Sequence, residues 1–112
     1  MNFSHTTNQL EKLLESAIRA SDKASRDIAL AIIVGYVNVV REALSRLPGL
    51  PQHVRDQLKA LLAVVDSAVK RLSDDVEQKH LEQYAHLGMA LASASIAMDL
   101  VSTGFQPPRT VL

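Results

Sequence analysis

The stretch IALAIIVGYVNVVREALSRL, residues 28–47, decides the fold. Residues of an α-helix follow one another at about 100° around the axis, and on this spacing the apolar side chains form two stripes. The first stripe contains Ile28, Ile32, Tyr36, Val39 and Ala43. The second contains Leu30, Ile33, Val37, Val40, Leu44 and Leu47. Together they cover about 200° of the helix, roughly twice the width expected of a helix that packs on one side.

Such a wide apolar surface needs more than one neighbour. One stripe can pack inside the chain, whereas the other needs a central position in a bundle or a partner. We favour self-association about a two-fold axis. The predicted partner or dimer interface is Leu30, Ile33, Val37, Val40, Leu44 and Leu47, together with Phe105 beyond the last helix. Two alternatives stay open: shorter helices wrap residues 28–47 completely, or Phe105 tucks back onto its own bundle.

Proline and glycine divide the chain into helices. The sequence PGLP at residues 48–51 ends one helix and starts the next, because proline blocks helix continuation and glycine permits a reversal. Before it, three-and-four spacing of apolar residues predicts helix over residues 6–47, broken near 21–25, where Asp22 can cap the second piece. After it, the prediction is helix over 51–103, with a further break near 73–75 left open, and an extended tail over 104–112.

These boundaries predict an all-α fold in a single domain, residues 1–112. Its main feature is a long antiparallel helical hairpin about residues 48–51. An additional N-terminal helix completes a small helical bundle, which we expect to be a homodimer.

Small residues recur along the last predicted helix. Ala85, Gly88, Ala92 and Ser95 follow one another at three- and four-residue spacing. Small side chains let two helix backbones approach closely, so one interpretation is tight antiparallel packing against the helix of residues 28–47. The other is that alanine is simply the best helix former.

Composition excludes several classes of protein. The chain has 112 residues, 12 Lys and Arg against 12 Asp and Glu, and no cysteine. Zero net charge argues against a nucleic-acid binder, and the lack of cysteine excludes disulfides and thiolate metal sites. No signal peptide is recognisable, and no run reaches the roughly 20 apolar residues of a membrane span. The apolar stretches 28–40 and 87–101 are therefore expected to be buried helices of a cytoplasmic protein.

Candidates for chemistry are few. Glu77 and His80 have the Glu-x-x-His spacing of di-iron carboxylate bundles, but such sites need a second copy and further carboxylates. Solvated surface residues are the simpler interpretation, and we expect no catalytic residue, metal or cofactor. Asp99 is an acidic residue in an apolar helix. Its side chain either faces solvent or pairs with an arginine of a neighbouring helix. The basic residues around the central break form either a local patch or a solvated face; they are Arg41, Arg46, Arg55 and Lys59.

The layout resembles the small, cysteine-free helical anti-activators of bacterial quorum sensing, the QslA type. The resemblance lies in the polar start at residues 1–5, the apolar run 28–40, the break 48–51 and the end GFQPP at 104–108. It implies a protein that binds the ligand-binding domain of a LuxR-type regulator. By covering the regulator's dimerisation surface, such a protein stops it from binding DNA. No individual binding residue carries over, because no motif matches residue by residue.

The expected function is therefore that of a non-enzymatic, protein-binding inhibitor, an anti-activator that acts on a LuxR-type transcription regulator. We expect homodimerisation and no binding to nucleic acid or membranes. Two other functions remain as alternatives: a secretion chaperone or immunity protein that binds an effector, and a metal-carboxylate bundle enzyme built on Glu77 and His80.

Overall fold

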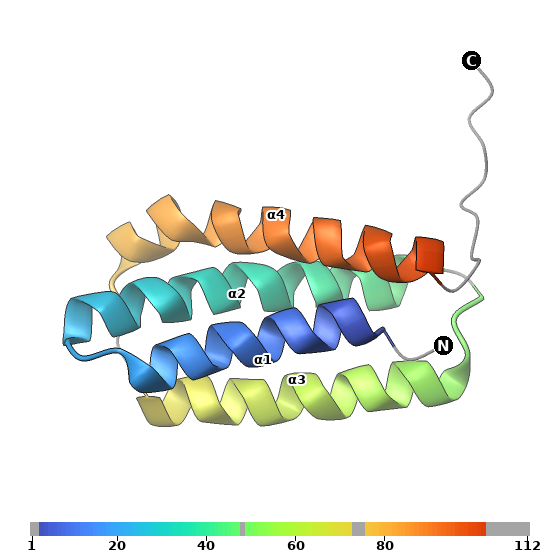
Figure 1. Cartoon of the computed structure of the whole chain (residues 1–112), viewed down its shortest axis with the longest axis horizontal. Helices are drawn as coiled ribbons and strands as arrows, with labels where there is room; N and C mark the ends of the chain where they lie inside the picture. The colour runs from blue at the N-terminus through green and yellow to red at the C-terminus, as the bar shows by residue number, and fades with distance from the viewer. Residues whose placement is uncertain (1–2, 48, 73–75, 103–112) are drawn as a thin grey trace, which may run out of the picture.

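The structure, a computed structural model, describes residues 3–47, 49–72 and 76–102. These residues form four α-helices: α1 (Ser4–Arg19), α2 (Lys23–Arg46), α3 (Gln52–Leu72) and α4 (Gln78–Ser102). Successive helices run in opposite directions, so α2 and α3 form the predicted antiparallel hairpin and α2 and α4 point the same way (Figure 1). The prediction of a small all-α bundle is confirmed.

The helix boundaries follow local chemistry. The chain leaves the helical conformation over residues 20–22, next to the predicted break at 21–25. Asp22 caps α2, since its carboxylate accepts a hydrogen bond from the backbone N–H of Ser25 at 2.7 Å, and this bond lowers the pKa of Asp22. At the central break Gly49 has φ 82°, a conformation that suits glycine. The predicted break at 73–75 and the tail at 104–112 lie outside the described residues.

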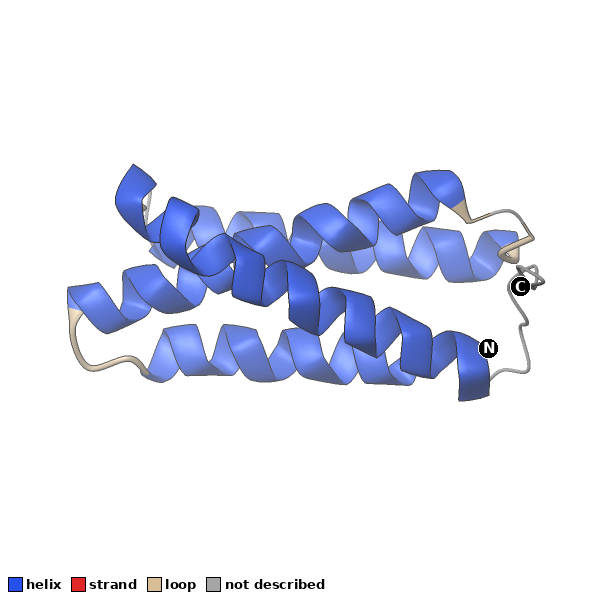
Figure 2. Cartoon of the chain, turned by 90° about the horizontal axis from the view of Figure 1, so that it is seen from above, coloured by secondary structure: helices blue, strands red, loops and turns tan. Residues whose placement is uncertain are grey.

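The tightest packing is between α2 and α4, which cross at a clear angle when viewed from above (Figure 2). A methyl group on Gly35 would overlap the carbonyl oxygen of Ala85, and one on Gly88 would overlap the carbonyl oxygen of Ile32. The small residues of the last helix therefore do serve close packing against α2. The predicted antiparallel direction was wrong, because α3 carries the chain back and makes α4 run parallel to α2.

Both apolar stripes of α2 are used inside the chain. The first faces α4, where Ile32 and Tyr36 lie against Gly88. The second faces α3 and α1, where Leu44 lines a gap with Leu58. The residues predicted for a partner interface are instead core: Leu30, Ile33, Val37, Val40 and Leu44 are at most 7 % exposed, and Leu47 is half-buried against them. The alternative that the shorter helices enclose residues 28–47 is the one that the structure shows, while Phe105 lies outside the described residues.

Asp99 anchors the N-terminus of α1. The residue that precedes α1, Phe3, has φ 48° and its side chain makes no capping hydrogen bond. Instead, the Asp99 carboxylate accepts hydrogen bonds from the backbone N–H groups of His5 and Thr6, both at 2.8 Å, and from the Thr6 hydroxyl at 2.6 Å. Asp99 is 1 % exposed. Its burial rules out the alternative in which it faces solvent, and toward α1 it supplies the negative charge that a helix N-terminus favours.

Tyr36 of α2 completes this connection. Its buried hydroxyl donates a hydrogen bond to the carbonyl oxygen of Thr6 at 2.8 Å. Burial raises the pKa of Tyr36, the charge of Asp99 raises it further, and a hydrogen bond with Ser95 opposes the rise. Side chains of α2 and α4 thus hold the first turn of α1 from two sides.

Candidate functional site

The outer side of α4 is the most unusual surface of the molecule. Most of the exposed large hydrophobic residues in the described part of the chain belong to this one helix. The full set is Ile18, Val64, Leu87, Met89, Met98 and Val101. Val101 is 77 % exposed, Met98 53 % and Leu87 50 %. Scattered single apolar residues are normal on a protein surface, but a concentration on one helix marks an interaction site.

Three of these residues form a regular line with two further residues of α4, and we call this line the α4 seam. It consists of Leu87, Leu91, Ala94, Met98 and Val101. The steps alternate between four and three residues, and this average of 3.5 is the spacing at which one helix packs lengthwise against another. At about 1.5 Å per residue the seam is about 21 Å long. Leu91 also packs against the core, so the seam begins at the edge of the buried side.

The α4 seam has no charge. Between Leu87 and Val101 the only charged residue is Asp99, which is turned inward onto α1. The residues that flank the seam on its solvent side are alanines, Ala90 and Ala97, both exposed. An exposed helix normally carries charged side chains on its outer side. The α4 seam itself is therefore apolar, and His5 of α1 lies beside it, where it lines a shallow surface pocket with Met98 and Val101.

The sequence shows that this helix is rich in apolar residues, but the interface was predicted on the helix of residues 28–47. The missed signal was the position of the small residues. Gly88, Ala92 and Ser95 lie on one side of the helix and let it approach α2 closely. Leu87, Met98 and Val101 then lie on the part of the helix that is exposed to solvent.

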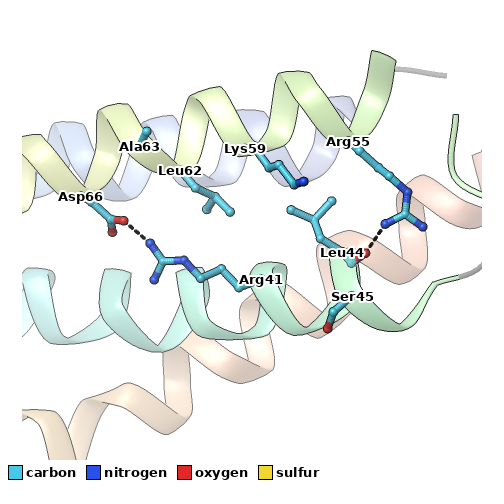
Figure 3. Close-up of a pocket in the computed structure, with 8 residues that line it drawn as sticks. All are labelled: Arg41, Leu44, Ser45, Arg55, Lys59, Leu62, Ala63 and Asp66. Carbon is cyan, nitrogen blue, oxygen red and sulfur yellow. Dashed lines mark hydrogen bonds and ion pairs between the residues drawn. The ribbon is translucent and has the colours of Figure 1, made fainter. Parts of the chain in front are cut away.

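A second feature is an open pocket of about 500 Å³ between α2 and α3 (Figure 3). Arg41, Arg55 and Lys59 line it together with apolar side chains such as Leu62, so three of the four basic residues around the central break do come together. The fourth, Arg46, pairs with Glu42 on α2 at 2.8 Å.

The arginines of this pocket are engaged with the chain itself. Arg41 forms an ion pair with Asp66 of α3 (Figure 3). Arg55 donates hydrogen bonds to the carbonyl oxygens of Leu44 and Leu47, the latter at 2.6 Å. These carbonyls belong to the end of α2, so Arg55 caps that helix and ties α3 to it. The cluster therefore has a structural role as a clamp between the two helices.

The Glu-x-x-His pair does not form part of a metal centre in the described residues. Glu77 pairs with Lys79 at 3.2 Å on the surface, and the ring of His80 lies 6.3 Å from that of Tyr84. Among the described residues, no three His, Cys, Asp or Glu side chains lie together in a group that could hold a metal ion.

Two described helices are long and apolar enough to cross a bilayer. By length and composition, α2 and α4 pass both for membrane spans and for apolar helices of a soluble bundle. In the most apolar window of each helix, 44 % of α2 is buried inside the fold, but only 22 % of α4. The expectation that both apolar stretches are buried is thus wrong for the outer side of α4.

No family model, curated protein or solved structure matches the chain.

Proposed function

We propose that the protein is a non-enzymatic, protein-binding inhibitor whose binding surface is the α4 seam. The observation that carries this proposal is the exposure of Leu87, Met98 and Val101 on an uncharged helix face. Exposing such side chains to water costs free energy, and covering them with a partner recovers it at about 25 cal/mol per Å² of apolar surface. A surface of this kind therefore favours a protein partner that offers an apolar face.

The proposed partner is a LuxR-type quorum-sensing regulator, the class that the resemblance to QslA-type anti-activators implies. A regulator that dimerises through an apolar surface exposes that surface whenever it is monomeric. The α4 seam is a straight, uncharged line about 21 Å long, which suits a helix or groove on such a surface. Covering it prevents dimerisation, and with it binding to paired half-sites on DNA.

The proposed location is the cytoplasm, where the regulator acts. Support comes from the way α4 is held in the bundle. Asp99 binds the first turn of α1, and Gly88 packs against the backbone of α2. These contacts hold α4 in the bundle at Gly88 and Asp99, while the exposed side chains of Leu87, Met98 and Val101 are accessible to a partner.

The test is a gel-shift assay with purified LuxR-type regulators and their DNA sites. We expect the wild-type chain to reduce DNA binding, and Met98→Glu to lose the effect because it places a charge within the α4 seam. Ser93→Glu is the matched control. Ser93 lies on the same helix, is exposed, and hydrogen-bonds only its own helix backbone at Met89 among the described contacts.

Two outcomes would overturn the proposal. One is a folded, soluble chain that leaves DNA binding unchanged across a panel of such regulators. The other is a Met98→Glu variant that inhibits as well as the Ser93→Glu control.

A further inference from the structure

We propose that in the free protein the α4 seam is covered by the α4 seam of a second copy of the chain, with the two helices antiparallel about a two-fold axis at Ala94. This inference goes beyond the proposed function, because it concerns the protein without its target. It also replaces residues 28–47, which the core uses, as the site of self-association.

Charge is the first argument for a second copy. Two identical surfaces always present the same charges to each other, so a charged face repels its own copy. The α4 seam has no charged side chain, and the whole chain has equal numbers of basic and acidic residues. No charge within the α4 seam opposes pairing, His5 of α1 is the polar side chain beside Met98 and Val101, and a net charge near zero favours association.

The arrangement of side chain sizes is the second argument. Ala94 lies at the centre of the α4 seam, seven residues from Leu87 on one side and from Val101 on the other. An antiparallel pair centred on Ala94 therefore places Leu87 of each copy opposite Val101 of its partner. The small side chain at the centre lets the two backbones approach, and the large ones fill the space toward each end.

The position of α4 in the fold permits such a pair. Seen from above, α4 crosses in front of the other described helices (Figure 2). On the seam, Leu87, Met98 and Val101 are each at least half exposed. Antiparallel pairing also sets the two helix dipoles in opposition, which is favourable compared with a parallel pair. The interface is isologous and closes after two copies, so it does not lead to filaments.

The size of the α4 seam predicts a weak dimer. A single pair of helices about 21 Å long covers less surface than the 1,200–2,000 Å² typical of stable complexes. We expect dissociation in the micromolar range. Since a second copy and a target protein need the same face, self-association competes with target binding. The apparent affinity for a target then falls as the chain concentration rises above the dimer dissociation constant.

The first experiment is sedimentation equilibrium of the full chain from micromolar to millimolar concentration. The wild type and Ser93→Glu are expected to rise from the monomer mass of 12.2 kDa to twice that value. Met98→Glu is expected to stay monomeric, with its dissociation constant raised at least 100-fold and its helical circular dichroism unchanged. A wild type that stays at monomer mass throughout overturns the inference. If that monomer still inhibits a regulator, the proposed function stands without it.

The second experiment, disulfide cross-linking, tests which helix face pairs and whether the two helices are antiparallel. The chain contains no cysteine, so every cross-link must come from an introduced one. Under mild oxidation Ala94→Cys should cross-link to itself, and a mixture of Leu87→Cys and Val101→Cys should give a mixed disulfide. A parallel pair would instead cross-link Leu87→Cys to itself. That result, or a dimer in which none of the three cysteines cross-links, contradicts antiparallel pairing through the α4 seam.

Discussion

Replacing Asp99 with alanine tests whether this side chain of α4 caps the N-terminus of α1 and thereby stabilises the fold. The Asp99 carboxylate accepts two backbone N–H groups and one hydroxyl from the first turn of α1. Those two residues, His5 and Thr6, are more than 90 positions away in the chain. No local sequence feature replaces the cap, since Phe3 at the N-cap position makes no side-chain hydrogen bond.

The magnitude follows from the donors that the substitution leaves behind. A buried donor without a partner costs about 1–3 kcal/mol, and the N–H of Thr6 is buried. The N–H of His5 is only partly buried and the Thr6 hydroxyl can rotate, so each of these adds less. Removing the carboxylate also removes its own cost of burial, which offsets part of the loss. We expect Asp99→Ala to lower the free energy of unfolding by about 3 kcal/mol.

The assay is urea unfolding followed by circular dichroism, combined with amide hydrogen exchange. In a domain of this size a loss of about 3 kcal/mol lowers Tm by about 12 °C. Exchange at the amides of His5 and Thr6 should accelerate more than exchange in the middle of α2. Asp99→Asn keeps one acceptor oxygen and should lose about half as much. A loss below about 1 kcal/mol for Asp99→Ala would show that the cap does not hold α1.

Three further predictions rest on single contacts. Burial raises the pKa of Tyr36 above 10.0, so the unfolded chain loses the hydroxyl proton at a lower pH than the folded chain does. The free energy of unfolding, measured with urea, should therefore fall as the pH rises above about 10. In Tyr36→Phe this fall should be weaker. Gly88→Ala should destabilise the protein in thermal unfolding although alanine favours helix, because the new methyl group would overlap the carbonyl oxygen of Ile32. Arg55→Met should lower the free energy of unfolding by about 1–2 kcal/mol, because it leaves carbonyl groups at the end of α2 without their donor; Lys59→Met, in the same pocket, should leave it nearly unchanged.

Each of these has a contrary outcome. An alkaline stability profile that Tyr36→Phe leaves unaltered would mean that another group dominates above pH 10. A Gly88→Ala variant as stable as the wild type would mean that α2 and α4 move apart easily. Equal effects of Arg55→Met and Lys59→Met would show that the loss of charge, and not of the cap on α2, decides stability.

Much of the fold was predictable because its signals are local. The three-and-four spacing of apolar residues, the break at residues 48–51 and the Asp22 cap depend on neighbours along the chain. The partners of each helix were not predictable in the same way. The stripe with Val37 and Val40 predicts a partner interface, because a chain with so few helices has little room to enclose a central one. In the structure α3 and α1 do enclose it, since α4 packs closely enough on the other stripe to leave them that side.

The all-α class, the hairpin and the aliphatic excess follow from local sequence patterns, because helix periodicity and proline breaks act over a few residues. Which part of that excess lies on the surface depends instead on how the helices pack. Gly35 and Gly88 let the backbones of α2 and α4 approach closely. The side of α4 that carries small residues therefore packs in the core, and Leu87, Met98 and Val101 are exposed. The same arrangement brings Asp99 to the first turn of α1. Both outcomes depend on contacts between residues far apart in the chain, whose energies exist only once the helices have met.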